Sequence, residues 1–322
     1  MKAIRFEQVG GPEVLQFIDV ELPAPGRGIA RVKHTAVGVN FIDTYHRTGL
    51  YKLPLPSGLG SEAAGVVEAV GEGVSNVKPG DRVAYAGAMG AYAEANNVPA
   101  DRLVKIPAGV SDETAAAAML KGMTAQYLLK RTYPVKRGET ILFHAAAGGV
   151  GLIAGQWAKH LGATVIGTVG SDEKVALAKE NGSAHDLNTR KEDWVKRVRE
   201  ITGGVGVPVV YDSIGKDTFM GSLDCLQVRG MMVSFGNASG AVPPFEAGIL
   251  SAKGSLYLTR PTLMSYTRNA KELQETADDL FAVIASGAVK IAIHQRFKLS
   301  EARKAHEALH SRNTTGATIL IP

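Results

Sequence analysis

The chain of 322 residues contains a single cysteine, Cys225. One cysteine excludes an internal disulfide and any zinc site built from clustered cysteines. No apolar run approaches the length of a membrane span, and the first residues, MKAIRFEQVGG, lack the apolar core of a signal peptide. We therefore expect a cytoplasmic protein that does not cross a membrane, with Cys225 as a buried, inert thiol.

The sequence also lacks a stripe in which basic and aromatic residues alternate. The net charge is +5 and the pI is near 9.1, but the positive residues are scattered, and the densest group lies between residues 191 and 199. This pattern does not favour nucleic-acid binding by base stacking. A modest positive excess suits an enzyme that binds a phosphate-bearing cofactor.

The pattern of elements predicts two lobes. The first ~105 residues consist mostly of short alternating runs typical of strands: 2–6, 15–20, 30–37, 65–70, 81–85 and 102–106. Ser111 is the expected N-cap of an alanine-rich helix that continues towards Arg131. The tail holds two amphipathic helices, 270–286 and 300–312, and a last strand, 317–321.

Between these parts, from Thr140, strands and helices alternate, which predicts a parallel sheet covered on both faces. We expect strands at 140–144, 163–169, 208–212, 231–235 and 255–259, and helices at 152–161, 173–180, 194–201 and 217–227. The predicted fold class is α/β: a Rossmann-type, doubly wound parallel sheet inserted into a mostly β catalytic domain. The expected boundaries are 1–122 and 261–322 for the catalytic domain and 123–260 for the Rossmann domain.

Residues 140–170 are the most informative stretch, because they read as strand, small-residue turn, helix and strand. The turn, AAAGGVG, contains Gly148, Gly149, Val150 and Gly151, and Ala146 stands where the first glycine of G-x-G-x-x-G would be. Small residues let a backbone approach a pyrophosphate, and a helix N-terminus offers it free N–H groups. The strand before the turn and the helix after it favour a dinucleotide site over a merely tight turn.

The tip of the second strand of this unit favours NADP(H) over NAD(H). An NAD site usually carries an acid there, for the ribose hydroxyl, whereas this chain has Gly170-Ser171. Asp172 and Glu173 fall in the first turn of the next helix, where acids serve as capping or dipole partners. Lys174 follows and could meet a 2′-phosphate, although a lysine on a solvated helix face is an equally ordinary interpretation.

Several motifs together resemble one family. The stretches GVVEAVGEGV (65–74) and KPGDRV (78–83) are similar to the N-terminal, GroES-like barrel of medium-chain dehydrogenases/reductases. With NFIDTY (40–45), LKGMT (120–124) and the glycine turn, the chain closely resembles the zinc-free NADPH:quinone oxidoreductases, relatives of zeta-crystallin. The resemblance implies hydride transfer from NADPH to a quinone, a small-molecule acceptor, and a homodimer. The cofactor would carry the chemistry while the protein orients it.

The residues themselves support the zinc-free branch. Zinc alcohol dehydrogenases of this superfamily carry Cys where Asn40 stands and His where Ser61 stands, and a lone, distant Cys225 cannot supply a structural zinc site. The motif His306-Glu307-Ala308-Leu309-His310 matches the zinc-protease signature H-E-x-x-H. A catalytic zinc needs a third protein ligand, and no His, Asp, Glu or Cys follows His310. We interpret this match as a coincidence, and we expect no metal site.

The resemblance suggests four candidate residues around the acceptor. They are Asn40, which could donate a hydrogen bond to the acceptor carbonyl, Asp43, which would orient its neighbours, and Tyr45 and Tyr51, which could stack on a quinone or donate a proton. Each residue alone could be structural, but together they favour a functional cluster. No strong general acid stands out, and the reduced quinone can take its proton from water.

The resemblance also implies the cofactor residues. Gly148 to Gly151 would bind the pyrophosphate, and Gly170, Ser171 and Lys174 the adenosine ribose and its 2′-phosphate. Ser213 would lie near the adenosine, and Phe235, Gly236 and Asn237 on the nicotinamide side. The remaining expected contacts are Phe41, Thr124, Tyr127, Arg260 and Arg312, of which Arg312 suits bidentate pairing with the 2′-phosphate. Relatives often carry tyrosine where Thr189 stands, which puts cofactor affinity in question.

Two alternatives remain open at this stage. An NADPH-dependent 2-alkenal or enone reductase would use the same fold and a similar slot beside the nicotinamide. A nucleic-acid-binding or structural role is known among zeta-crystallin-like proteins and is permitted by the mild basicity, without any motif that requires it. A dimer would form through an exposed strand edge such as 255–259.

Overall fold

The computed structural model describes residues 1–311 and 314–322, and these form two compact units. Unit 1 comprises residues 1–123, 267–285 and 291–322, and unit 2 comprises residues 124–266 and 286–290. The first two junctions, after residues 123 and 266, lie one and six residues beyond the positions 122 and 260 expected from the sequence, and the return of residues 286–290 to unit 2 was not expected. The α/β fold class, with a parallel sheet inserted into a lobe built from both parts of the chain, is confirmed.

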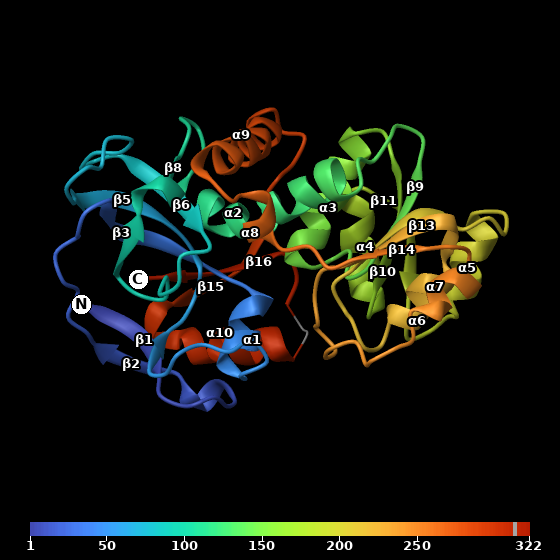
Figure 1. The fold of residues 1–322 in the computed structure, drawn as a ribbon, viewed down its shortest axis with the longest axis horizontal. Helices are drawn as coiled ribbons and strands as arrows, with labels where there is room; N and C mark the ends of the chain where they lie inside the picture. The colour runs from blue at the N-terminus through green and yellow to red at the C-terminus, as the bar shows by residue number, and fades with distance from the viewer. Residues whose placement is uncertain (312–313) are drawn as a thin grey trace. The chain divides into compact units, whose positions relative to one another are not determined.

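Unit 1 is built on two sheets with mostly antiparallel pairing, and in the larger one the late strand β16 lies beside the early strand β3 (Figure 1). The larger, seven-stranded sheet has the order β15-β16-β3-β5-β6-β8, with β7 paired to β3. The smaller, three-stranded sheet has the order β2-β1-β4. The strand bounds are β1 Lys2–Phe6, β2 Gln16–Asp19, β3 Ile29–Val39, β4 Ser57–Gly58, β5 Glu62–Val70, β6 Arg82–Ala86, β7 Ala95–Pro99, β8 Val104–Lys105, β15 Ile293–Lys298 and β16 Ala317–Ile321.

The sheets of unit 1 close over a core of alternate strand residues. Side chains such as Phe6, Val32, Val67 and Leu320 are at most 1% exposed and belong to one hydrophobic cluster. The helices of this part are α1 Phe41–Arg47, α2 Asp112–Tyr127, α9 Ala270–Ala285 and α10 Ala302–His310. The predicted N-cap of α2 is confirmed, since the backbone N–H of Thr114 donates to Ser111 Oγ at 3.1 Å. The last residues of α2 enter unit 2.

Unit 2 contains a six-stranded parallel sheet with the order β11-β10-β9-β12-β13-β14. Numbered within the unit, this order is 3-2-1-4-5-6, that of the doubly wound dinucleotide-binding fold. The bounds are β9 Thr140–Phe143, β10 Thr164–Val169, β11 Ser183–Asn188, β12 Val207–Asp212, β13 Leu226–Ser234 and β14 Tyr257–Thr259. Ligands bind such sheets outside the carboxyl ends of the strands, where the order reverses, here between β9 and β12.

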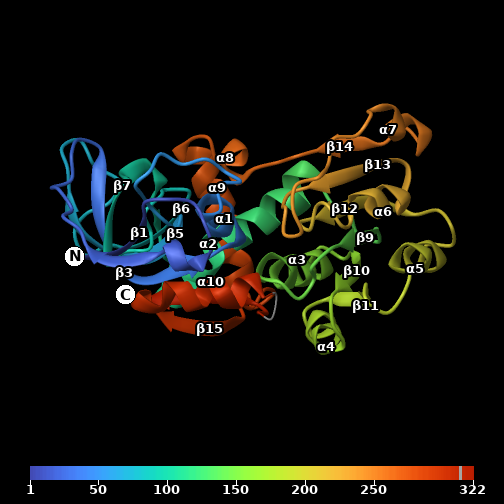
Figure 2. The same ribbon diagram turned by 90° about the horizontal axis from the view of Figure 1, so that it is seen from below.

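Helices cover both faces of this sheet. α3 (Gly149–His160) packs with α4 (Asp172–Glu180), and α5 (Trp194–Ile201) packs with α6 (Phe219–Asp224), one pair on each side (Figure 2). The shorter α7 (Gly248–Ala252) and α8 (Leu263–Tyr266) flank β14 in the chain. The right-handed crossovers of such βαβ units place successive helix N-termini at the edge where the strands end. Among the described residues, no helix is both long and apolar enough to cross a bilayer.

Some predicted elements differ from those observed. The helix expected over 217–227 is wrong in extent: α6 ends at Asp224, and β13 begins at Leu226, five residues before the expected strand. The chain leaves the helix there because the Cys225 carbonyl accepts a hydrogen bond from Val207 N–H at 2.9 Å. β11 and β15 were not predicted, since both are polar edge strands with sequences SAHDLN and IHQRFK. Cys225 is fully buried, and burial raises the pKa of its thiol to about 12.

Candidate functional site

The turn between β9 and α3 is shaped so that only small residues fit. Gly148 is the N-cap of α3, and Ala145 adopts a φ of 54°, in the left-handed region. A Cβ on Gly151 would lie 2.3 Å from the Ala145 carbonyl oxygen, so any side chain there would displace the turn. The resulting cradle presents the free N–H groups at the start of α3, which suits a pyrophosphate.

The next strand end, after β10, carries the expected ribose residues. Ser171 is the N-cap of α4, and Lys174 lies in its first turn. Asp172 accepts a hydrogen bond from Asn188 Nδ2 at 2.7 Å and is paired with Lys191. Both carboxylate oxygens of this acid are therefore already engaged by the end of β11 and the loop after it. This arrangement agrees with the absence of an acid at the tip of β10.

Asp212, at the end of β12, organises the loop that follows. Its Oδ1 accepts hydrogen bonds from the backbone N–H groups of Ile214 at 2.8 Å and Gly215 at 3.0 Å. Its Oδ2 accepts from Thr218 Oγ1 at 2.7 Å and Ser222 Oγ at 2.9 Å. The carboxylate therefore fixes the turn that presents Ser213, a residue that the resemblance assigned to the adenosine.

A buried histidine ties this carboxylate to the neighbouring strand. His144 Nε2 lies 2.9 Å from Ser222 Oγ, and His144 Nδ1 lies 2.7 Å from Thr168 Oγ1 on β10. Burial lowers the pKa of His144, so the neutral ring links the ends of β9, β10 and β12. The sequence HAAAGGVG gave no signal for this network, because its partners lie 24 and 78 residues away.

The loop after β13 approaches the loop after β12 closely. A Cβ on Gly236 would lie 2.5 Å from the Ser213 carbonyl oxygen, so Gly236 permits the contact. Arg260, after β14, donates from Nη1 to Ser234 Oγ at 3.1 Å and to the Gly236 carbonyl at 2.9 Å. Arg260 thus holds the loop of Phe235, Gly236 and Asn237 in this structure, a role that the sequence did not indicate.

The end of α2 contributes two further expected residues to unit 2. Thr124 and Tyr127 are both at least nine-tenths buried. The Tyr127 ring stacks on the Tyr266 ring with a centroid distance of 4.5 Å and an interplanar angle of 11°. Burial raises the pKa of Tyr127 above its usual range, so its hydroxyl stays protonated.

In unit 1, Asn40 is held from two sides. Its backbone N–H donates to Asp43 Oδ2 at 2.8 Å, which ties the start of α1 to its own first turn. Its side-chain Nδ2 donates to Glu62 Oε2 at 2.7 Å. Both acids are fully buried. Burial raises the pKa of the Asp43 carboxyl from 3.8 to about 7.

Glu62 forms the centre of a buried ionic cluster that sequence reasoning missed. Its Oε1 accepts a hydrogen bond from Leu120 N–H at 2.6 Å, and its Oε2 lies 3.2 Å from Lys121 Nζ. Lys121 is itself only 6% exposed. The available signal was an acid at the head of an apolar strand, EAAGVV, and a lysine within an apolar helix. Buried charges of this kind are paired.

Tyr45, Tyr51 and Phe41 form an aromatic group on and after α1. The Tyr45 and Tyr51 rings are 5.3 Å apart in an edge-to-face arrangement, and the Phe41 and Tyr45 rings are 6.5 Å apart. The Tyr51 backbone N–H donates to the Tyr45 carbonyl at 3.0 Å. Asn40, Asp43 and these rings therefore all lie on one short helix and the turn after it. Arg312, the remaining expected residue, lies outside the described residues.

The H-E-x-x-H motif is divided between the core and the surface. His306 is fully buried and packs edge-to-face on Tyr92 with the ring centroids 5.7 Å apart, whereas His310 is exposed. Within residues 1–311 and 314–322, no three His, Cys, Asp or Glu side chains are grouped so that they could hold a metal ion. His306 is therefore a core residue of unit 1 with a hydrogen-bonding role.

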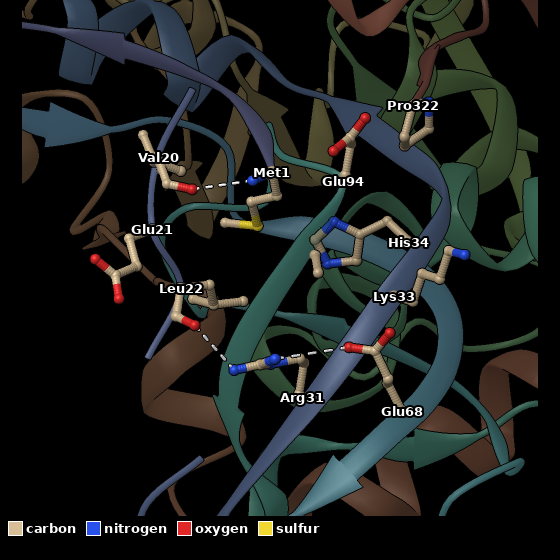
Figure 3. Close-up of a pocket in the computed structure, with 11 residues that line it drawn as sticks. Met1, Val20, Glu21, Leu22, Arg31, Lys33, His34, Glu68, Glu94 and Pro322 are labelled. Carbon is tan, nitrogen blue, oxygen red and sulfur yellow. Dashed lines mark hydrogen bonds and ion pairs between the residues drawn. The ribbon is translucent and has the colours of Figure 1, made fainter. Parts of the chain in front are cut away.

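A hollow of about 540 Å³ lies elsewhere on unit 1 (Figure 3). Several of its polar groups are paired within the protein: the Met1 amino group donates to the Val20 carbonyl at 3.0 Å, and Arg31 Nη2 donates to the Leu22 carbonyl at 3.0 Å. His34 Nδ1 lies 2.7 Å from the Ala93 carbonyl oxygen. The residues that line it differ from all the candidate site residues.

Comparisons with known proteins cover the whole chain. Residues 26–108 match the alcohol dehydrogenase GroES-like domain, and residues 149–283 match the zinc-binding dehydrogenase family. The chain is 56% identical over 323 residues to the quinone oxidoreductase of Pseudomonas aeruginosa, which covers 100% of this chain and 99% of that protein. It is 46% identical to a 2-haloacrylate reductase from Burkholderia sp, with 97% and 96% of the two chains covered. Among solved structures, Escherichia coli quinone oxidoreductase complexed with NADPH matches with a TM-score of 0.99 and 53% identity, over 100% of both chains.

Proposed function

The chain belongs to the quinone oxidoreductases of the medium-chain dehydrogenase/reductase superfamily, and from this we infer that it reduces quinones with NADPH. The observation that carries this function is the full-length match to a quinone oxidoreductase complexed with NADPH. The parallel sheet, its switch point and the small-residue turn provide the cofactor-binding scaffold that such a reaction needs.

The residues of unit 2 fit the cofactor. The Gly148–Gly151 turn would bind the pyrophosphate, since a Cβ on Gly151 would meet backbone at 2.3 Å and the N–H groups of α3 are free there. Ser171 and Lys174 would bind the adenosine ribose and its 2′-phosphate, and Ser213 would contact the adenosine. Phe235, Gly236 and Asn237, with Thr124 and Tyr127, would contact the nicotinamide half. When bound, NADPH supplies a hydride from its nicotinamide C4.

The acceptor would be bound by the residues of α1 and the turn after it. Asn40 would donate a hydrogen bond to the acceptor oxygen, where negative charge develops on reduction. Tyr45 and Tyr51 would pack against the planar ring, and Asp43 would orient Asn40. The reduced quinone would take its proton from water. Since Asn40 and Ser61 stand where zinc enzymes carry Cys and His, we propose that the reaction needs no metal ion.

Turnover of simple quinones tests this function. We expect rapid oxidation of NADPH with 1,4-benzoquinone and 9,10-phenanthrenequinone, much slower oxidation of NADH, and no loss of activity with EDTA. Binding of NADPH without turnover of any quinone would contradict quinone reduction. Inhibition by EDTA would contradict the metal-free mechanism alone.

One relative supports a second candidate activity. The 46% identical Burkholderia protein is a 2-haloacrylate reductase, so this scaffold also accommodates an electron-poor double bond. The two activities would be separated by kcat/KM for naphthoquinone and for an alkenal, measured side by side. A higher value for the alkenal would assign the enzyme to double-bond reduction.

We also propose a homodimer that forms through β14. This strand is at the edge of the six-stranded sheet, and Tyr257 and Leu258 on it are 59% and 36% exposed. An exposed apolar edge strand is a ready surface for pairing with a second copy. The cytoplasmic location expected from the sequence remains a prediction, which fractionation of cells would test.

A further inference from the structure

Tyr92 connects the acceptor-side residues of unit 1 to the C-terminal helix α10. Its hydroxyl lies 2.9 Å from Asp43 Oδ2 and 3.1 Å from His306 Nε2. Asp43, Tyr92 and His306 are all fully buried. Asp43 Oδ2 also accepts the Asn40 backbone N–H, so a continuous chain of hydrogen bonds joins His306 to Asn40.

The position of Tyr92 is fixed by its surroundings. Gly60 has a φ of +81°, and a Cβ there would lie 2.1 Å from Cδ1 of the Tyr92 ring, so the ring packs directly on the glycine backbone. The Tyr92 N–H donates to the Leu59 carbonyl at 2.9 Å, and its carbonyl accepts from Ile4 N–H at 2.7 Å. The tight packing of the ring and the two backbone hydrogen bonds thus hold the Tyr92 hydroxyl towards Asp43.

Because the Tyr92 hydroxyl carries a single proton, it can donate only one of its two hydrogen bonds, to Asp43 or to His306, and must accept the other. While Asp43 is ionised, Tyr92 donates to the carboxylate and must accept from His306. Burial lowers the pKa of His306 to about 3, so the ring is neutral and carries its proton on Nε2. His306 Nδ1 has no hydrogen-bond partner, as expected for the bare nitrogen of that tautomer.

We propose that Tyr92 is a positioning residue for quinone reduction: its hydroxyl, supported by His306, holds Asp43 and thereby fixes Asn40 for the acceptor. The inference rests on the proposed function, because Asn40 is the residue proposed to touch the acceptor oxygen. Glu62 fixes the Asn40 side chain from the opposite side, through the 2.7 Å bond to Nδ2. Loss of either restraint would let the amide move, and a displacement of about 1 Å can slow catalysis a hundredfold.

Asp43 lies among several ionisable groups. Tyr92 from the loop before β7, Glu62 from β5 and Lys121 from α2 act on it directly. His306 from α10 lies behind Tyr92, and Arg47 on α1 interacts electrostatically with Tyr92 and His306. The Tyr92 hydrogen bond favours the ionised carboxylate, so it lowers the pKa of Asp43 against the larger effect of burial.

Unit 1 offers a matched control for Tyr92. Tyr85 is also fully buried, and its hydroxyl also meets a buried histidine, His34 Nε2, at 3.0 Å. Tyr85→Phe and Tyr92→Phe therefore remove the same group from similar surroundings. We expect similar losses in melting temperature, but kcat with benzoquinone about tenfold lower in Tyr92→Phe and within twofold of wild type in Tyr85→Phe.

Two further measurements separate positioning from general destabilisation. In Tyr92→Phe the pKa of Asp43 rises, so the acidic limb of the kcat–pH profile should move to higher pH by about one unit, and Tyr85→Phe should leave it in place. NADPH affinity, measured by fluorescence without turnover, should change less than twofold in both variants. An unmoved acidic limb in Tyr92→Phe would overturn the proposal.

Variants of His306 test the same chain if Tyr92→Phe does not fold. His306→Gln keeps an N–H donor for Tyr92 and should retain most of the activity, whereas His306→Leu removes the donor and should resemble Tyr92→Phe. Equal activity of the two variants would overturn the proposal. No quinone turnover by wild type would contradict the proposed function itself, whereas an active wild type with Tyr92→Phe no slower than Tyr85→Phe would contradict the positioning role alone.

Discussion

Lys174, in the first turn of α4, is our proposed ligand for the 2′-phosphate of NADPH. Lys174 follows the N-cap Ser171, and the neighbouring Asp172 is already paired with Lys191. We expect Lys174→Ala to raise KM for NADPH at least tenfold and to change KM for NADH less than twofold, because only NADPH carries the extra phosphate. The same selective loss is expected for Arg312→Ala. Steady-state kinetics with both cofactors check this, and equal losses would contradict the assignment.

Asp43 should make stability depend on pH in the direction opposite to most acids. Its pKa is raised by burial to about 7 from 3.8, so the folded protein holds this proton more tightly than the unfolded chain does. Its contribution to stability is complete below pH 3.8 and is lost as the pH rises towards 7, by up to about 1.4 kcal/mol for each pH unit.

The Asp43→Asn variant tests this dependence. The free energy of unfolding of the variant, relative to wild type, should increase as the pH rises from about 4 to about 7, since asparagine cannot ionise. Urea unfolding at several pH values measures it, with the exposed Asp101→Asn as control. A difference that stays constant across this range would contradict a raised pKa.

Among the elements, the start of α3 depends on Gly151, because a glycine has no side chain. In Gly151→Ala the new Cβ would lie 2.3 Å from the Ala145 carbonyl oxygen, so the turn must shift and its N–H groups turn away from the phosphate. We expect at least a tenfold loss of NADPH affinity by fluorescence titration. Gly248→Ala at the start of α7 is the control, because a Cβ there would have no neighbouring atom within 4 Å apart from those of adjacent residues and its own helix. This variant should bind NADPH normally. Normal binding by Gly151→Ala would exclude this turn as the pyrophosphate site.

The sequence predicts elements well where periodicity and caps agree. α5 (Trp194–Ile201) and β16 (Ala317–Ile321) have the predicted bounds, and the parallel sheet followed from alternating strands and helices. The prediction missed β11, because its polar sequence SAHDLN lies at an edge of the sheet and pairs with only one neighbouring strand. Edge strands tolerate polar residues, so their pattern resembles that of a loop.

The candidate site shows the same limit. The glycine turn was visible because its residues are consecutive, and Gly151 has a local steric reason, the Ala145 carbonyl oxygen 2.3 Å from where a Cβ would lie. The chain from His306 to Tyr92 and Asp43 was not, since its members are separated by 214 and 49 residues and only the folded core brings them together. The sequence singled out His306 only as part of H-E-x-x-H, a signature of zinc binding and not of a hydrogen bond to a tyrosine. Its hydrogen bond to Tyr92 depends on tertiary contacts that no local motif records.

At the scale of the whole molecule, the edge strand β14 determines the expected assembly. Leu258 is 36% exposed on that strand. We expect Leu258→Lys to shift the protein from dimer to monomer in sedimentation velocity, because the charge would be buried between two edges. Val205→Lys replaces a residue that is 63% exposed outside the strands and should remain dimeric. A Leu258→Lys variant that stays dimeric would place the interface elsewhere.

The order of strands in unit 1 also governs how the chain is made. β16 lies between β15 and β3 in the seven-stranded sheet, although the whole of unit 2 is encoded between β3 and β16. A ribosome therefore releases the complete six-stranded sheet of unit 2 before it supplies β16, the last of the three strands that pair with β3. During that interval β3 lacks one neighbour, and the half-built sheet must stay open until translation reaches residue 317. Synthesis of this enzyme thus finishes unit 2 first and unit 1 last.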